Sequence, residues 1–241
     1  MRKILSATAV LGVIAFAAVI GVFLLRSDDP GLATEAPLIT SPTGAAAALD
    51  VAPTGTAAVD LPAGVRRFVI DPSGSSAKYV VKENLRLIDT TAVGETNAIS
   101  GEIYLSPDGL YAGSASTFTV DLRELESDES RRDSYIKRTT LDTSSFPFAE
   151  FVVESLTGFP AGYVEDTQIA LTLTGSMTIH GVSQPMTFTV LARQAGDSLT
   201  AAADADFKMT DFGIEPPSVQ IAAARDEVHI QIVLLAREPA A

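Results

Sequence analysis

The chain has no cysteine and no tryptophan, and it has only two histidines, His180 and His229. The missing thiols exclude a disulfide scaffold, a cysteine nucleophile, a cysteine-based zinc site and a lipidated N-terminal cysteine. The two histidines lack the spacing of a ligand pair, so we expect no metal. The sequence also lacks the nucleophile elbow, the zinc-protease helix motif and the phosphate-binding loop, and we expect no catalytic residues and no cofactor.

Positive charge is scarce as well: 17 Lys and Arg stand against 30 Asp and Glu, for a net charge of −13. Such a surface repels nucleic acid and anionic lipid headgroups, so we expect no nucleic-acid partner. Any association with a membrane would therefore have to come from a dedicated segment of the chain.

Residues 1–26 have the pattern of such a segment. Arg2 and Lys3 precede an uncharged apolar run from Ile4 to Leu25, and Arg26 closes it. At about 1.5 Å per residue in a helix, this run is long enough to cross a hydrocarbon core of about 30 Å. We expect a transmembrane anchor in a bacterial cell membrane, with Arg2 and Lys3 in the cytoplasm and the rest of the chain outside. Cleavage after a small-residue pattern such as that of residues 15–17 stays open and would give a secreted protein.

Residues 27–64 are rich in proline, alanine and threonine and show no apolar periodicity. Such a segment cannot bury enough apolar surface to offset its chain entropy, so we expect a disordered linker. Residues 65–238 then form the only globular domain.

The globular part alternates between apolar and polar residues with period two, as in Ile169-Ala-Leu-Thr-Leu and Met186-Thr-Phe-Thr-Val. This pattern predicts strands, and the short turn signals between them predict antiparallel neighbours, so we expect an all-β fold. The pattern alone does not choose between a sandwich and a closed barrel. Residues 123–138 are highly charged without alternation and are expected to form a short helix or an ordered loop across one end of the sheet.

Three segments, residues 131–151, 174–185 and 207–214, resemble the YceI-like family of bacterial periplasmic and secreted proteins in their order and spacing. The resemblance implies a lipocalin-like, eight-stranded antiparallel β-barrel with a short helical insertion. It also implies that the lumen binds a long apolar ligand, either a polyisoprenoid or an isoprenoid quinone. An eight-stranded barrel is wide enough for one slender molecule, which agrees with this expectation.

The candidate lumen residues are apolar or aromatic side chains on the expected inward faces: Phe68, Tyr79, Val81, Phe118, Val120, Leu122, Leu141, Phe151, Met177, Ile179, Phe188, Phe207 and Phe212. The candidate contacts for a polar headgroup at the mouth are Arg132, Asp133, Tyr135 and His180. For His180 a structural role in a turn is the competing interpretation.

The sequence thus leads to the hypothesis of a membrane-tethered, extracytoplasmic carrier, store or chaperone for an isoprenoid lipid. Two alternatives remain. One is a protein–protein interaction module whose barrel is filled by its own side chains. The other is an enzyme acting on an isoprenoid. It ranks last, because the sequence offers only His180 and scattered acidic residues for catalysis.

Overall fold

The computed structural model describes residues 61–86, 88–219 and 222–240. The expected anchor at residues 1–26 and most of the expected linker at 27–64 lie outside these residues. Within the described part of the chain, no helix is both long and apolar enough to span a bilayer.

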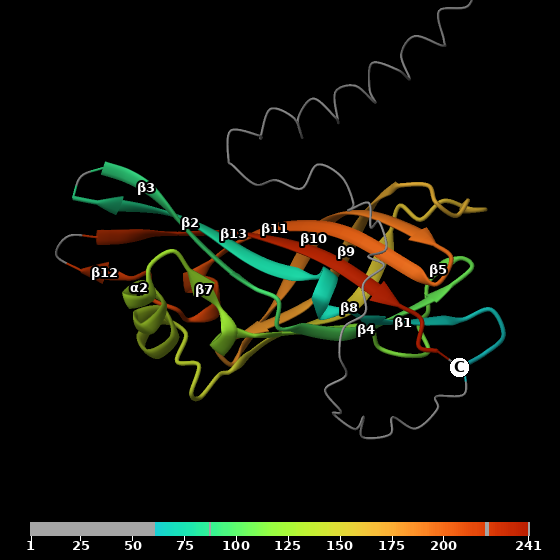
Figure 1. Ribbon diagram of the computed structural model, residues 1–241, viewed down its shortest axis with the longest axis horizontal. Coiled ribbons are helices and arrows are strands. Elements are labelled where there is room, and N and C mark those ends of the chain that lie inside the picture. Colours follow the sequence, from blue (N-terminus) through green and yellow to red (C-terminus); the bar gives the residue numbers. More distant parts are fainter. Residues whose placement is uncertain (1–60, 87, 220–221, 241) are drawn as a thin grey trace, which may run out of the picture. The chain divides into compact units, whose positions relative to one another are not determined.

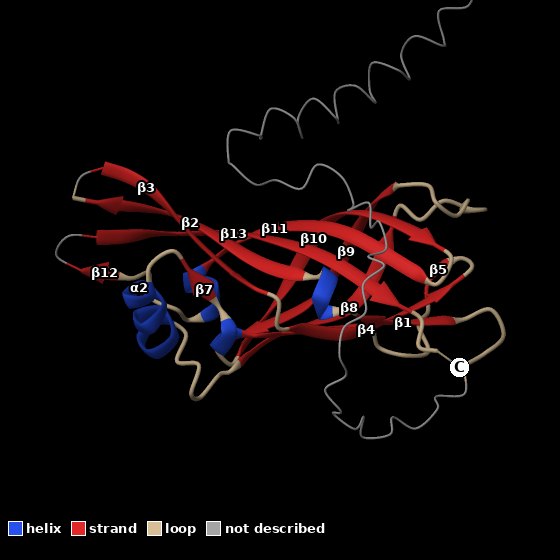
Figure 2. Ribbon diagram, viewed as in Figure 1, coloured by secondary structure: helices blue, strands red, loops and turns tan. Residues whose placement is uncertain are grey.

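The described residues form a closed antiparallel barrel of eight strands (Figures 1 and 2). The ring closes because β1 pairs with β13, with Val69 opposite Arg237. The all-β barrel expected from the resemblance is therefore confirmed. In ring order the strands are β1 (Arg66–Ile70), β4 (Ile99–Ser106), β6 (Thr117–Asp121), β8 (Phe148–Thr157), β9 (Ile169–Ile179), β10 (Val182–Ala195), β11 (Ser198–Lys208) and β13 (Ala222–Arg237).

At one end of the barrel, further strands extend this ring. After the 3₁₀ turn η1 (Pro72–Gly74), β2 (Ser76–Leu85) continues β1 along β13 and pairs with β3 (Ile88–Thr96). The short β7 (Glu126–Ser127) then pairs with β3. The hairpin of β2 and β3 and the hairpin of β12 (Ser218–Val219) and β13 lie side by side here, on the left of Figure 1. At the opposite end, β5 (Gly109–Leu110) pairs with β4.

Alternating burial explains why these segments are strands. Along β10, Met186, Phe188 and Val190 are buried, whereas Thr187 and Thr189 are exposed. A two-residue turn joins β9 to β10, and both of its residues, His180 and Gly181, have positive φ, of 52° and 74°. Two positive φ values define the type I′ turn whose twist matches that of a hairpin.

The charged stretch forms the expected helical insertion. It contains the 3₁₀ turn η2 (Leu122–Glu124), the helix α2 (Ser130–Tyr135) and the π-turn η3 (Ile136–Thr140), and it lies beside the two hairpins (Figure 2). The Glu129 side chain accepts a hydrogen bond from the backbone N–H of Arg131 and thereby caps α2. A last 3₁₀ turn, η4 (Met209–Phe212), follows β11 and buries Phe212.

Candidate ligand cavity

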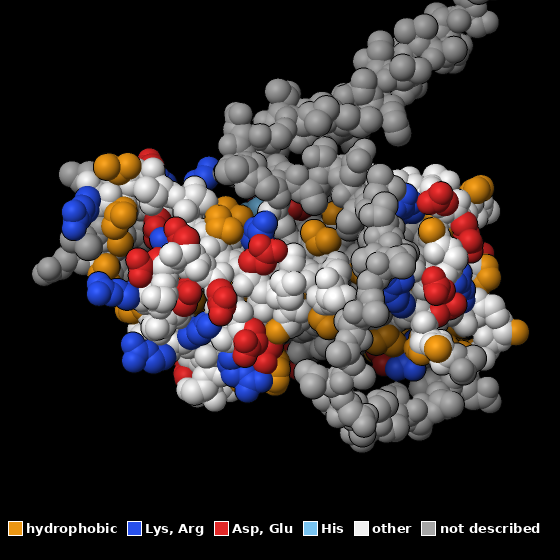
Figure 3. Space-filling model, viewed as in Figure 1, with side chains coloured by type: hydrophobic (Ala, Val, Ile, Leu, Met, Phe, Trp, Pro, Cys, Tyr) orange, Lys and Arg blue, Asp and Glu red, His pale blue; other side chains and the backbone are white. Residues whose placement is uncertain are grey.

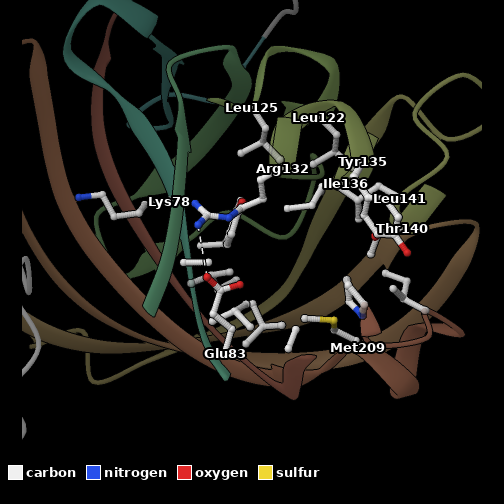
Figure 4. Close-up of a pocket in the computed structure, with 18 of the residues that line it drawn as sticks. Lys78, Glu83, Leu122, Leu125, Arg132, Tyr135, Ile136, Thr140, Leu141 and Met209 are labelled. Atoms are coloured by element: carbon white, nitrogen blue, oxygen red, sulfur yellow. Dashed lines mark hydrogen bonds and ion pairs between the residues drawn. The ribbon is translucent and has the colours of Figure 1, made fainter. Parts of the chain in front are cut away.

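The half of the barrel next to the helical insertion contains a cavity of about 680 Å³. β2 and β13 supply much of its wall, and the insertion covers one side of it (Figure 4). The lining is mostly apolar because inward residues alternate with outward residues along each strand. Leu85 and Val219 line the cavity and are also exposed, so the cavity reaches the surface at the end of the barrel that carries the two hairpins.

Eight of the thirteen candidate lumen residues line this large cavity. They are Tyr79, Val81, Val120, Leu122, Leu141, Met177, Ile179 and Phe207. Their side chains come from four strands, β2, β6, β9 and β11, and from the insertion, so only the closed barrel brings them together.

The other five candidates lie elsewhere in the core. Phe118 lines a second cavity of about 90 Å³ at the opposite end of the barrel. Phe68, Phe151 and Phe188 are buried but line neither cavity. Phe212, the last residue of η4, is buried, and its ring lies edge-on to that of Phe207 at a centroid distance of 5.1 Å.

Sequence reasoning did not select several residues that line the large cavity. From the insertion these are Leu125 and Ile136, which carry no strand periodicity, and from η4 it is Met209, which continues the alternation of β11. From β13 they are Val228, Ile230 and Ile232, whose alternation marks an inward face. That alternation could have identified the β13 residues, whereas the insertion residues had no such signal.

Arg132 is the central polar residue at the cavity. Its guanidinium donates to Asp128 at 2.5 Å and to Glu83 at 3.3 Å, and the second contact links α2 to β2 (Figure 4). Both Arg132 and Glu83 are largely buried, with side-chain exposures of 23% and 15%. Two carboxylates therefore already balance the charge of this arginine.

Tyr79 adds a neutral hydroxyl to the cavity wall. Burial raises the pKa of Tyr79 to about 12, and the nearby Arg132 opposes this only in part. The phenol thus stays protonated at neutral pH and can donate or accept a hydrogen bond.

The remaining mouth candidates have different positions. Tyr135 lines the cavity and is partly exposed. Asp133 does not line it, and instead accepts hydrogen bonds from the backbone N–H and the hydroxyl of Ser127, which holds the insertion together. His180 also lies outside the lining, in the β9–β10 turn, with its ring 4.7 Å from that of Phe146.

No group of three or more histidine or acidic side chains placed to hold a metal occurs among the residues that the structure describes. The acidic residues that line the large cavity are Glu83 of β2, which contacts Arg132, and Asp128 and Glu129 beside α2. The arrangement suits the burial of an apolar molecule with one polar end.

Fold and cavity together define a small closed β-barrel with an apolar internal cavity open at one end. Residues 68–236 match the YceI-like domain, and the chain belongs to that family. A UPF0312 protein of Vibrio cholerae is 27% identical to it over 155 residues, which cover 61% of this chain and 77% of that protein.

Solved structures share the fold. A polyisoprenoid-binding domain from Saccharophagus degradans superposes with a TM-score of 0.57 at 13% identity, over 71% of this chain and 98% of that one. BcnA of Burkholderia cenocepacia superposes with a TM-score of 0.55 at 21% identity, over 69% of this chain and 98% of that one. At these identities the likeness concerns the fold.

Proposed function

We propose that this protein binds one long apolar lipid, a polyisoprenoid or an isoprenoid quinone, in the large cavity and acts as its carrier, store or chaperone. The observation that carries the proposal is the cavity of about 680 Å³ with its mostly apolar lining. Ligand sites typically have volumes of about 300–1,000 Å³, and each buried methylene contributes about 0.8 kcal/mol. The solved relative described as a polyisoprenoid-binding domain supports this ligand class.

The polar residues at the cavity favour a neutral headgroup. Arg132 is already paired with Asp128 and Glu83, so a phosphate would have to compete with two carboxylates. A quinone carbonyl or a prenol hydroxyl needs only hydrogen-bonding groups, and Tyr79 and Arg132 provide them.

The exposed hairpin tips give the ligand an apolar path into the barrel. Leu85, Ile88 and Val219 are 38%, 65% and 51% exposed, and Figure 3 shows hydrophobic side chains at the end of the molecule where these hairpins lie. A lipid that moves along such side chains exposes less of its own apolar surface to water.

Tethering to the bacterial cell membrane through residues 1–26 is part of the proposal. The support is the apolar run between Lys3 and Arg26 in the sequence. A tether would keep the extracytoplasmic barrel close to the bilayer in which an isoprenoid dissolves.

The alternative, an interaction module with a self-filled barrel, draws on Phe68, Phe151 and Phe188, which are buried and line neither cavity. The large cavity of about 680 Å³ argues against this alternative, because the buried rings leave it unfilled.

Lipid extraction of the purified full chain, followed by mass spectrometry, tests the proposal. We expect about one isoprenoid per protein molecule. Ala149 lines the large cavity, so Ala149→Trp should reduce the retained lipid severalfold by filling it. The matched control is Glu150→Trp, on the exposed side of the same strand. A folded wild type that is empty and takes up no added prenol or quinone would favour the interaction module.

A further inference from the structure

The lumen of the barrel is not one continuous tube. The large cavity and the cavity of about 90 Å³ share no lining residue. Between them lies a layer of buried side chains, formed by Phe151 of β8, Phe188 of β10 and Ala205 of β11. None of these side chains lines either cavity.

Consecutive inward residues of single strands show the division. On β8, Ala149 lines the large cavity and Val153 the small one, and Phe151 stands between them. On β11, Ala205 separates Phe207 of the large cavity from Ala203 of the small one.

The rings of the layer support each other. The Phe151 and Phe188 rings meet edge-on, at an interplanar angle of 75° and a centroid distance of 5.0 Å. Such pairs are favourable beyond their burial alone. Phe118, which lines the small cavity, lies 6.3 Å from Phe151 and backs the layer from that side.

Gly175 on the neighbouring strand leaves room for this packing. It faces Val153 across the β8–β9 ladder, and a Cβ at this position would lie 2.8 Å from Cζ of Phe151. Any larger residue would push the Phe151 ring out of its place in the layer.

We propose that this aromatic layer is the floor of the ligand site and sets the longest isoprenoid chain that the barrel buries. The inference rests on the proposed function. The cavity follows β2 from Ala77 to Leu85. At about 3.3 Å per residue and a strand tilt of about 40°, the accessible depth is roughly 20 Å. Isoprene units beyond this depth stay outside the mouth and gain no burial.

The test compares chain lengths on the full-length protein. The protein is mixed with an equimolar series of all-trans prenols, namely geraniol, farnesol, geranylgeraniol and solanesol, and is then repurified, and the retained alcohols are quantified by mass spectrometry. Each buried methylene raises the affinity about fourfold. Retention by the wild type should therefore rise with length until the cavity is full and then stay level.

Phe188→Leu should join the two cavities and move this plateau to a longer chain. Phe188→Ala removes more of the side chain and should move the plateau further. If the alanine variant fails to fold, the leucine variant still tests the inference, because it retains apolar bulk. Adding Ala203→Leu should fill the small cavity and restore the wild-type plateau, because Ala203 lines that cavity. Phe146→Leu is the matched control, since Phe146 lines neither cavity.

Three results overturn the inference. A folded Phe188→Leu protein with the wild-type plateau shows that the layer does not limit length. If retention by the wild type keeps rising up to solanesol, the layer is not a floor, although the lipid-binding function stands. A wild type that retains no prenol of any length overturns the proposed function and this inference with it.

Discussion

Arg132 Nη2 lies 3.3 Å from Glu83 Oε1, and this contact joins the helical insertion to β2 across the large cavity. The insertion is short, and the pairing of β7 with β3 attaches it to the barrel as well. The pair therefore connects the stability of the covering segment with access to the cavity.

Arg132→Met should destabilise the domain by about 1–2 kcal/mol, between the values typical of exposed and of buried pairs. The loss arises because Glu83 would remain mostly buried without its partner. Bound prenol should also dissociate faster from the loosened insertion. Urea unfolding and a ligand-release assay measure the two effects. Arg138→Ala, an exposed change in η3, is the control, and equal effects from both variants would contradict the role of the pair.

Gly175→Ala should destabilise the domain more strongly than an ordinary surface change. The added Cβ would lie 2.2 Å from the carbonyl oxygen of Val152, and a backbone atom cannot move aside cheaply. We expect a loss of about 2–3 kcal/mol in the free energy of unfolding, as for overpacked cores. Gly162→Ala is the comparison, because no atom lies within 4 Å of its added Cβ and only its positive φ opposes the change. Equal losses at both sites would show that crowding at Gly175 is unimportant.

His229 should make stability depend on pH near neutrality. Its Nδ1 lies 2.9 Å from Asp206 Oδ1, and its Nε2 lies 3.4 Å from Asp204 Oδ1. The Asp204 carboxylate contributes most to raising the pKa of His229, partial burial opposes this, and Asp206 adds to the increase. Since the folded pKa is above the unfolded value of about 6.5, the stabilisation is complete below pH 6.5 and is lost as the pH rises through the folded pKa.

His229→Gln removes this titration. The stability difference between wild type and variant should therefore be largest in mildly acidic buffer and decrease above about pH 6.5. Chemical unfolding at a series of pH values measures it. A difference that stays constant over this range would contradict the assignment.

Under the proposed function, removing the lipid should lower the stability of the full-length protein. A ligand that binds only the folded state, present at about 100 times its Kd, adds about 2.7 kcal/mol. Delipidated protein should melt at a lower temperature and recover when farnesol is added. Ala149→Trp should show little response to farnesol, and a full response from that variant would place the ligand outside the large cavity.

Ile88→Ser should slow the uptake of prenol from neutral vesicles with almost no effect on stability. The side chain is 65% exposed at the hairpin tip, so the fold gains little from it. A stopped-flow transfer assay measures the uptake rate. Val164→Ser is the matched control, because Val164 is 70% exposed and lines neither cavity. Equal uptake rates for both variants would show that the ligand does not enter along the hairpin tip.

The sequence by itself determined the strand character of the chain, the antiparallel pairing of neighbouring strands and the family. Alternation along Met186-Thr-Phe-Thr-Val identified one buried face of β10, and the motifs around residues 131–151 and 174–185 identified the barrel. It also predicted a short helix or an ordered loop in the charged stretch, and the helix α2 lies there.

Only the tertiary structure decided the height of each inward residue in the lumen. Ala149, Phe151 and Val153 share one face of β8, yet they belong to the large cavity, the aromatic layer and the small cavity. Period-two alternation specifies the face of a strand, whereas the register between neighbouring strands specifies the level at which side chains meet. That register depends on long-range pairing, such as Val153 with Gly175, and no local pattern encodes it.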